Sequence, residues 1–243
     1  MRIVGRVAAM VLLMPVCAAL HYAFRPFTDH NPWPRLFLKA VSGIVGLRIS
    51  TCGERVERGA FFVANHVSWL DIPAICGLTG SAFVAHDGLA AHRLLHWLCR
   101  LNDTVLIARH DRTSIARQVE QVRQALRETG ALTVFPEGTT YDGTHIAPFK
   151  SSLLSALSPI PQGIRVQPVW LDYGQRSEDI AWVGSESGLA NFLRIAARRT
   201  PIALTIHFLP VLAGDALASR KTIAAAARDA IVSASLHRGE ALS

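Results

Sequence analysis

Short apolar runs alternate with amphipathic segments along most of the chain. The runs predict buried strands over 47–51, 60–64, 83–85, 104–108, 131–135, 202–209 and around 166–169. Between them, apolar residues recur at helical spacing over 68–78, 94–101, 115–129 and 220–236. Strands that alternate with helices predict an α/β fold, here a single domain with a mostly parallel central sheet flanked by helices.

The N-terminal end has a different pattern. Residues 7–20 are apolar apart from Cys17, and Arg2 and Arg6 precede them. A helix that spans a bilayer needs roughly 20 apolar residues, and a basic stretch before a short apolar run is also typical of a signal peptide. The sequence around Ala18 is a poor cleavage site. We therefore expect an uncleaved hydrophobic helix that dips into a membrane or just spans it.

Two further helical segments each allow two interpretations. The segment 35–45 either packs on the core or lies at a lipid interface, which Trp33 before it would suit. The segment 191–197 either meets anionic headgroups through Arg194 and its neighbours or has an ordinary polar face.

The composition indicates contact with lipid rather than with nucleic acid. Half of the residues are hydrophobic, 18% are charged and the mean hydropathy is +0.27, which is more apolar than a typical soluble domain. A net charge of +7 favours anionic partners, but no nucleic-acid-binding motif appears. The four cysteines are widely spaced and have no histidine at metal spacing, so we expect small buried side chains and no metal site.

The clearest candidate for chemistry follows the apolar run 60–64. Residues 65–71 read NHVSWLD, which puts His66 at the end of a strand and Asp71 five positions later. Histidine titrates near neutral pH, and a carboxylate on its other ring nitrogen would fix the tautomer and stabilise the imidazolium. About 0.4 such pairs are expected by chance in this chain, so a histidine that merely caps a strand explains this stretch alone.

A second polar stretch, FPEGTT at residues 135–140, ends another predicted strand. Glycine lets the backbone approach a ligand there, and successive amides and hydroxyls can hold an anionic group. By itself this stretch is also explained by a Pro-Gly turn with an exposed glutamate. Ligands of a parallel sheet bind beyond the carboxyl ends of its strands. Those ends carry His66, Arg109 and Glu137, so we expect these residues to share one site.

Four stretches resemble blocks of the glycerolipid acyltransferases, the family that contains 1-acylglycerol-3-phosphate acyltransferase. Residues 65–71 resemble its N-H-x4-D box and residues 135–139 match its F-P-E-G-T box. Residues 105–109, VLIAR, are similar to its arginine-containing second block, and 166–169, VQPV, resemble its V-x-P-V block. The order and spacing agree, and the first and third boxes together form a specific signature.

The resemblance implies a reaction. His66 would be the general base that takes the proton from a lipid hydroxyl as this hydroxyl attacks an acyl thioester. Asp71 would orient His66 and stabilise its charged form. No enzyme nucleophile is required, because the acceptor hydroxyl takes that part.

The same resemblance assigns the binding of the acceptor headgroup. Arg109 and the loop formed by Glu137, Gly138 and Thr139 would hold it, and arginine suits a phosphate or a carboxylate. Lys150 would add positive potential near the site, although a solvated surface lysine is an equally simple interpretation.

The sequence departs from the family pattern at three positions. Thr140 stands where many phosphate-binding members have arginine, Ala108 replaces an acidic residue, and His86 stands where lysine is common. These departures leave the base chemistry intact and weigh against lysophosphatidate as the acceptor. Residues 135–143 are closer to bacterial members that acylate lyso-ornithine lipid or other lysolipids.

We therefore expect a membrane-associated O-acyltransferase of phospholipid or membrane lipid biosynthesis, with a hydrophobic anchor at 1–24 and an acyltransferase domain at 25–243 whose core is about 47–212. It would use no metal or other cofactor, and acyl-CoA or acyl carrier protein would be the donor co-substrate. The acceptor would be 1-acylglycerol-3-phosphate or a lyso-ornithine lipid, on the cytoplasmic face of the bacterial inner membrane. The alternatives are a lysolipid hydrolase with the same His–Asp pair and a non-catalytic lipid-binding module at an anionic membrane surface.

Overall fold

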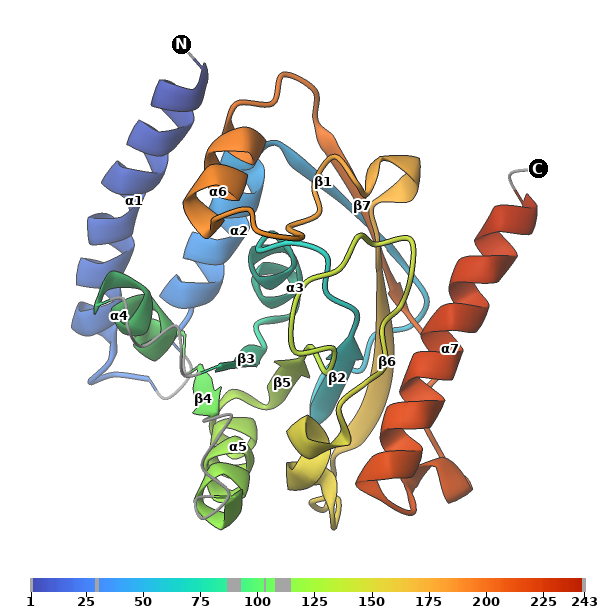
Figure 1. Cartoon of the computed structure of the whole chain (residues 1–243). Coiled ribbons are helices and arrows are strands. Elements are labelled where there is room, and N and C mark those ends of the chain that lie inside the picture. Colours follow the sequence, from blue (N-terminus) through green and yellow to red (C-terminus); the bar gives the residue numbers. More distant parts are fainter. Residues whose placement is uncertain (1, 29–30, 87–92, 103, 108–114, 242–243) are drawn as a thin grey trace.

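A computed structural model of the chain describes residues 2–28, 31–86, 93–102, 104–107 and 115–241. In these ranges seven strands form one sheet, in the order β1-β7-β6-β2-β5-β3-β4 (Figure 1). The strands are β1 (Leu47–Cys52), β2 (Ala60–Ala64), β3 (Ala82–His86), β4 (Val105–Ile107), β5 (Ala131–Val134), β6 (Arg165–Asp172) and β7 (Ile202–Phe208).

The mostly parallel sheet expected from the sequence is confirmed. β2 lies at its centre and pairs in parallel with β5 on one side and with β6 on the other. β3 and β4 extend the same parallel set, whereas β7 runs antiparallel to β6 and parallel to β1. The carboxyl ends of β2, β5 and β6 therefore meet at one edge of the sheet.

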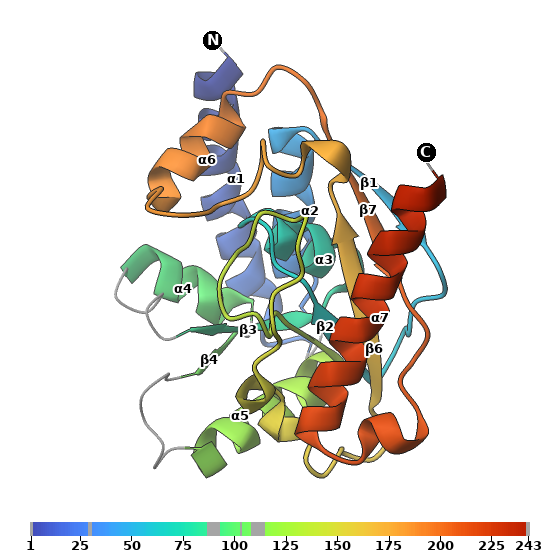
Figure 2. The same cartoon turned by 45° about the vertical axis from the view of Figure 1, so that its right-hand side comes forward.

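Helices cover both faces of the sheet. α2 (Trp33–Val45), α3 (Asp71–Thr79) and α6 (Gly188–Ala196) lie on one face. On the other face lie α5 (Ile115–Thr129), α7 (Arg220–Ala241) and the short 3-10 helix Ser151–Leu157. Figure 2 shows α7 crossing β6 on the side away from α2 and α3. α4 (Arg93–Leu101) lies near the end of the sheet that β3 and β4 form (Figure 1).

β2 is buried on both faces, as its uninterrupted apolar sequence predicts. Phe61 and Val63 face the core layer that includes α5 and α7, whereas Phe62 and Ala64 face the layer that includes α3. Each of these four side chains is fully buried. The strand that ends at the NHVSWLD stretch is thus buried along its whole length.

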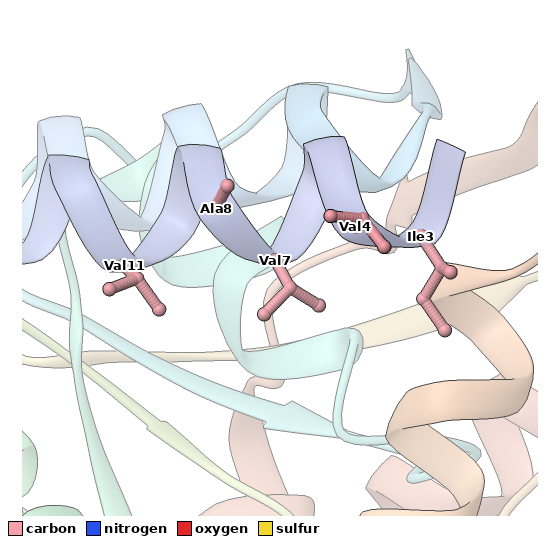
Figure 3. A pocket seen from close by; sticks show the side chains of 5 residues that line it. All are labelled: Ile3, Val4, Val7, Ala8 and Val11. Atoms are coloured by element: carbon pink, nitrogen blue, oxygen red, sulfur yellow. The ribbon is translucent and has the colours of Figure 1, made fainter. Parts of the chain in front are cut away.

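α1 (Arg2–Phe24) is a helix, as expected, and at 23 residues it is longer than the apolar run that predicted it. Its first turns are held against α6, because Arg6 donates to the backbone carbonyls of Ala196 and Arg198. The helix is long and apolar enough to cross a membrane, and 11% of its most apolar window is buried. Val4 and Leu12 are each 69% exposed. Figure 3 shows the side chains of Ile3, Val7 and Val11 projecting from one side of the helix.

The two segments with open interpretations pack within the domain. α2 buries Val41 and Val45 and lies against α1 and α3. In α6, Arg194 forms an ion pair with Glu186, and Arg198 lies 3.5 Å from the carboxylate of Asp179. Arg194 of α6 and Arg198, which follows this helix, therefore each have a carboxylate partner in the chain itself.

Two local expectations differ from the structure. α3 begins at Asp71 rather than at residue 68. Its first turn accommodates Pro73, because the N–H groups of the first turn have no partner inside a helix. Three of the four cysteines are buried as expected, but Cys52 is exposed at the end of the edge strand β1.

Candidate active site

His66 and Asp71 form a hydrogen-bonded pair directly after β2. Nδ1 of His66 and Oδ2 of Asp71 are 2.7 Å apart. The Asp71 side chain has no exposed area and the His66 side chain is 17% exposed. The imidazole ring stacks on Phe135 at the end of β5, with ring centroids 4.3 Å apart. Because the carboxylate accepts at Nδ1, that nitrogen carries the hydrogen, and Nε2 is left with the lone pair that can take a proton.

The turn between the two residues is built around the Asp71 carboxylate. The backbone N–H groups of Val67 and Ser68 donate to Oδ2 at 2.6 and 2.9 Å. Asp71 is also the first residue of α3, where the helix dipole favours a negative charge. Residues 66–71 thus form a closed loop that places the Asp71 carboxylate beside the His66 ring.

Asn65 fixes this turn to the neighbouring strand. Its side-chain amide donates to the carbonyl of Leu171 on β6 at 3.2 Å, and its oxygen accepts from the N–H of Leu171 at 2.7 Å. Both bonds are buried. The side chain therefore continues the β2–β6 pairing beyond the last backbone pair, Ala64 and Val169.

Glu137 lies beside His66, as expected from the parallel pairing of β2 and β5. Its Oε1 accepts from the backbone N–H of His66 at 2.9 Å, and 2% of the residue is exposed. Burial raises the pKa of Glu137 to about 8, although the N–H groups of His66 and Ala147 and the charge of Arg228 act in the opposite direction. The nearby Asp71 carboxylate adds to the rise. At neutral pH this carboxyl group is therefore mostly protonated.

The loop after Glu137 carries the other residues expected to bind substrate. Gly138 has a φ of +74°, and a Cβ at this position would lie 2.8 Å from Nζ of Lys150. The exposed Lys150 thus extends over Gly138, and its backbone N–H donates to Pro136 at 2.8 Å. Thr139 is exposed. The structure brings Lys150 to this loop, which the sequence could not establish.

Thr140 faces the protein rather than solution. Its hydroxyl donates to the backbone carbonyl of Trp182. The backbone N–H of Trp182 in turn donates to the carbonyl of Val67 at 3.0 Å. The next residue, Tyr141, donates its N–H to the carbonyl of His66 at 2.8 Å. The loop is therefore tied to the turn that carries the His–Asp pair.

Tyr173 is a site residue that the sequence analysis missed. It follows β6 directly, and its buried hydroxyl donates to Oδ1 of Asp71 at 2.6 Å. The available signal was its position four residues beyond the VQPV block, on the same predicted strand or just after it. That signal was weak, because a tyrosine after a strand has many ordinary packing roles.

One expected site residue cannot be placed. Arg109 lies in 108–114, outside the described residues, and so does Ala108 before it. In the parts of the chain that the structure describes, no group of three or more His, Cys, Asp or Glu residues is arranged to hold a metal ion. The independence from metals and other cofactors stays a prediction.

The arrangement provides a base with a fixed tautomer, a buried counter-charge and an adjacent loop that offers a neutral acid and a positive charge. A hydroxyl that reaches Nε2 of His66 can lose its proton as it attacks an electrophile.

Comparisons with known proteins agree with this chemistry. The family model described as Acyltransferase matches residues 48–172. The lyso-ornithine lipid O-acyltransferase of Rhodobacter capsulatus is 31% identical over 248 residues, which cover 95% of this chain and 88% of that protein. The 1-acyl-sn-glycerol-3-phosphate acyltransferase of Neisseria gonorrhoeae is 32% identical over 129 residues, 53% of this chain and 50% of that protein.

A solved structure has the same fold. The crystal structure of the 1-acyl-sn-glycerophosphate acyltransferase PlsC from Thermotoga maritima superposes with a TM-score of 0.65 and covers 98% of each chain at 19% identity. At that identity the likeness concerns the fold alone.

Proposed function

Because the chain belongs to the acyltransferase family, we propose that it transfers a fatty acyl group from an acyl thioester to the hydroxyl of a lysolipid. The observation that carries the proposal is the His66–Asp71 pair at the carboxyl end of the central strand, with Nε2 of His66 left to accept a proton. A base held in this way needs a hydroxyl to activate, and a lysolipid supplies one.

The proposed reaction has two proton transfers through one atom. The lysolipid hydroxyl gives its proton to Nε2 of His66 while its oxygen attacks the thioester carbonyl carbon. Asp71 stabilises the imidazolium formed in this step, because its carboxylate lies 2.7 Å from Nδ1. The tetrahedral intermediate then expels the thiolate, which takes the proton from Nε2. An ester bond has formed, a thioester bond has broken, and the base is restored.

Glu137, Gly138 and Thr139 would contact the headgroup of the acceptor, with Lys150 and Arg109 as the positive groups. The raised pKa of Glu137 supports this role, because a protonated carboxyl can donate a hydrogen bond to an anionic or hydroxyl oxygen. The positive φ of Gly138 opens the backbone at the same place.

Within the lysolipids, we propose lyso-ornithine lipid as the acceptor. The Rhodobacter capsulatus relative, which aligns with 95% of this chain, carries that name, and relatives from Rhizobium meliloti and Brucella abortus carry it as well. Thr140 supports the choice, because its short uncharged side chain bonds to Trp182 and offers no positive charge to a phosphate. Ornithine is an amino acid with a carboxylate, which Lys150 and Arg109 would suit.

The proposed location is the cytoplasmic face of the bacterial inner membrane, with α1 as the anchor. The exposed apolar side chains of α1 support this location. The net charge of +7 would favour an anionic membrane surface. Acyl-CoA or acyl carrier protein would deliver the acyl group, and both are thioesters.

The test is acyl transfer by purified protein in vesicles, with each donor and with either lyso-ornithine lipid or 1-acylglycerol-3-phosphate as the acceptor. We expect the diacyl product from lyso-ornithine lipid and loss of at least 10³-fold in rate for His66→Ala, on the order of the loss from removing a catalytic base. His145→Ala is the matched control, because this histidine is exposed and pairs with Asp142 at the surface. If His66→Ala retains the wild-type rate, the proposed chemistry is wrong; if only 1-acylglycerol-3-phosphate is acylated, the proposed acceptor is wrong.

A further inference from the structure

The Asp71 carboxylate has an uneven set of hydrogen-bond donors. Its Oδ2 accepts from His66 and from the backbone N–H groups of Val67 and Ser68. Its Oδ1 accepts from Tyr173, and within the described residues no other donor to this oxygen is recorded. Because Asp71 has no exposed area, loss of a donor to this carboxylate would be costly.

The position of Tyr173 is fixed by the contacts of Asp172, the residue before it at the end of β6. Asp172, the last residue of β6, accepts from the N–H of Gly174 at 2.8 Å and from the guanidinium of Arg238 on α7. Asp172 and Trp170 face α7, so Tyr173 and Leu171 point to the other face of the sheet, where Asp71 lies. α7 thus fixes the turn from which the phenol reaches the His–Asp pair.

We propose that Tyr173 is a positioning residue that sets the proton affinity of His66 through Asp71. The inference is structural, and its consequence for the rate rests on the function proposed above. The pair becomes a three-member chain from phenol to carboxylate to imidazole, contributed by the ends of β6 and β2 and by the start of α3.

The physical argument concerns the charge on the carboxylate. A phenol that donates to Oδ1 stabilises the negative charge and reduces the pull of the carboxylate on the proton at Nδ1. Without that donor, the carboxylate gains more from a positive imidazole, and His66 becomes a stronger base. The phenol stays a donor throughout, because burial and the Asp71 charge hold the pKa of Tyr173 well above its usual value.

The other charged and titratable groups around His66 must be kept constant. Asp71 faces it from α3, Tyr173 at the end of β6 contacts Asp71, and the ring of Phe135 after β5 is neutral. From the loop after β5, Glu137 binds the backbone N–H of His66 and has a pKa near 8, while Arg228 of α7 acts on Glu137. The measurement is therefore made in a Glu137→Gln background, which removes the titration of this neighbouring carboxyl group from the readout.

The test is NMR titration of ¹³C-labelled histidine in the full chain, with the His66 signal identified by its absence in His66→Gln. We expect Tyr173→Phe to raise the titration midpoint of His66 by less than about one unit, because the phenol bonds to Asp71 in both protonation states of His66 and only the difference between these states moves the midpoint. Tyr22→Phe is the matched control. Tyr22 lies on α1, and its hydroxyl accepts a hydrogen bond from the indole N–H of Trp97 at 3.2 Å rather than contacting His66 or Asp71. An unmoved midpoint in folded Tyr173→Phe overturns the proposal.

A second variant keeps the test decisive if Tyr173→Phe does not fold. Fluorotyrosine at position 173 keeps the ring and the hydroxyl but donates more strongly, so the His66 midpoint should fall rather than rise. A midpoint that does not fall also overturns the proposal.

A double-mutant comparison separates positioning from packing. In an Asp71→Asn background, Tyr173→Phe should leave the His66 midpoint in place, because the carboxylate that connects the two residues is gone. A merely structural role of the phenol would produce the same shift in both backgrounds, which would count against the proposal.

The NMR readout uses no substrate, so it is independent of the proposed function. In active protein the acidic limb of the kcat/KM profile should move upward with Tyr173→Phe by the same amount as the NMR midpoint. If the wild-type protein shows no acyl transfer while the midpoint shifts as expected, the proposed function fails and the positioning role stands.

Discussion

Asp71→Asn tests how much of the proposed catalysis comes from one negative charge. In the wild-type protein, Oδ2 of Asp71 accepts hydrogen bonds from the backbone N–H groups of Val67 and Ser68. An asparagine must therefore place its oxygen there, because its NH₂ group would face these donors. The oxygen would still accept from Nδ1 of His66, and the amide NH₂ would face the Tyr173 hydroxyl, which can rotate to accept. The variant keeps the tautomer of His66 and removes the charge.

The magnitude follows from the distance. With charge centres about 4 Å apart and an effective dielectric constant of about 20, the imidazolium gains at most about 4 kcal/mol from the carboxylate, or three powers of ten in rate. The His66 side chain is 17% exposed, so solvent screens part of this interaction. We expect the rate of acyl transfer to fall about 10²- to 10³-fold.

The assay is the initial rate of thiol release from the acyl donor in vesicles that contain the lysolipid. Asp142→Asn is the matched control, because Asp142 also accepts from two backbone N–H groups and lies 3.2 Å from a histidine, but at the surface. Circular dichroism verifies that both variants fold. A folded Asp71→Asn protein with the wild-type rate would refute the electrostatic role of Asp71.

Three further predictions concern the surroundings of the pair. The pKa of Glu137 in the folded protein is about 8, against an ordinary value of 4.5. Between these pH values the folded state keeps a proton that the unfolded state has lost, so the Glu137 carboxyl group lowers the stability of the protein as pH rises through this window. Glu137→Gln should therefore raise Tm relative to wild type by an amount that grows across that window, and a constant difference would contradict the cause assigned to the shift. Asn65→Ala leaves the N–H and the carbonyl of Leu171 without partners in the core. Urea denaturation should therefore show a loss of about 2–4 kcal/mol in unfolding free energy. A loss below about 1 kcal/mol would mean that water replaces the amide. Replacing Val4, Val11 and Leu12 of α1 together by Asn should reduce co-sedimentation with anionic vesicles without lowering Tm, because these side chains are 59–69% exposed. The control is Leu236→Asn on α7, because Leu236 is 65% exposed. Unchanged sedimentation of the α1 variant would place the membrane contact elsewhere.

The sequence predicted those parts of the site that follow from strand ends. A continuous apolar run marks β2, and a second marks β5, so His66 and Glu137 were expected at one edge of a parallel sheet. Their adjacency depends only on which strands pair. The structure adds the contact itself, an Oε1 that accepts from the His66 backbone.

What the sequence could not provide are contacts between residues far apart that carry no repeating pattern. Tyr173 reaches Asp71 only because Trp170 and Asp172 occupy the α7 face of β6, and the face that a strand residue takes depends on register. Lys150 lies over Gly138 because its backbone binds Pro136. The antiparallel placement of β7 was also not predicted, because an apolar strand has no sequence mark for its direction.

The pairing of β1 has a consequence for synthesis of the chain. Within the described structure β1 pairs with β7 alone, and Leu47 lies opposite Ile202. During translation, β1 leaves the ribosome long before its partner, so it waits without a neighbour while α1 is already available to a membrane. A nascent chain that ends before residue 202 should therefore present an unpaired strand, a template for aggregation.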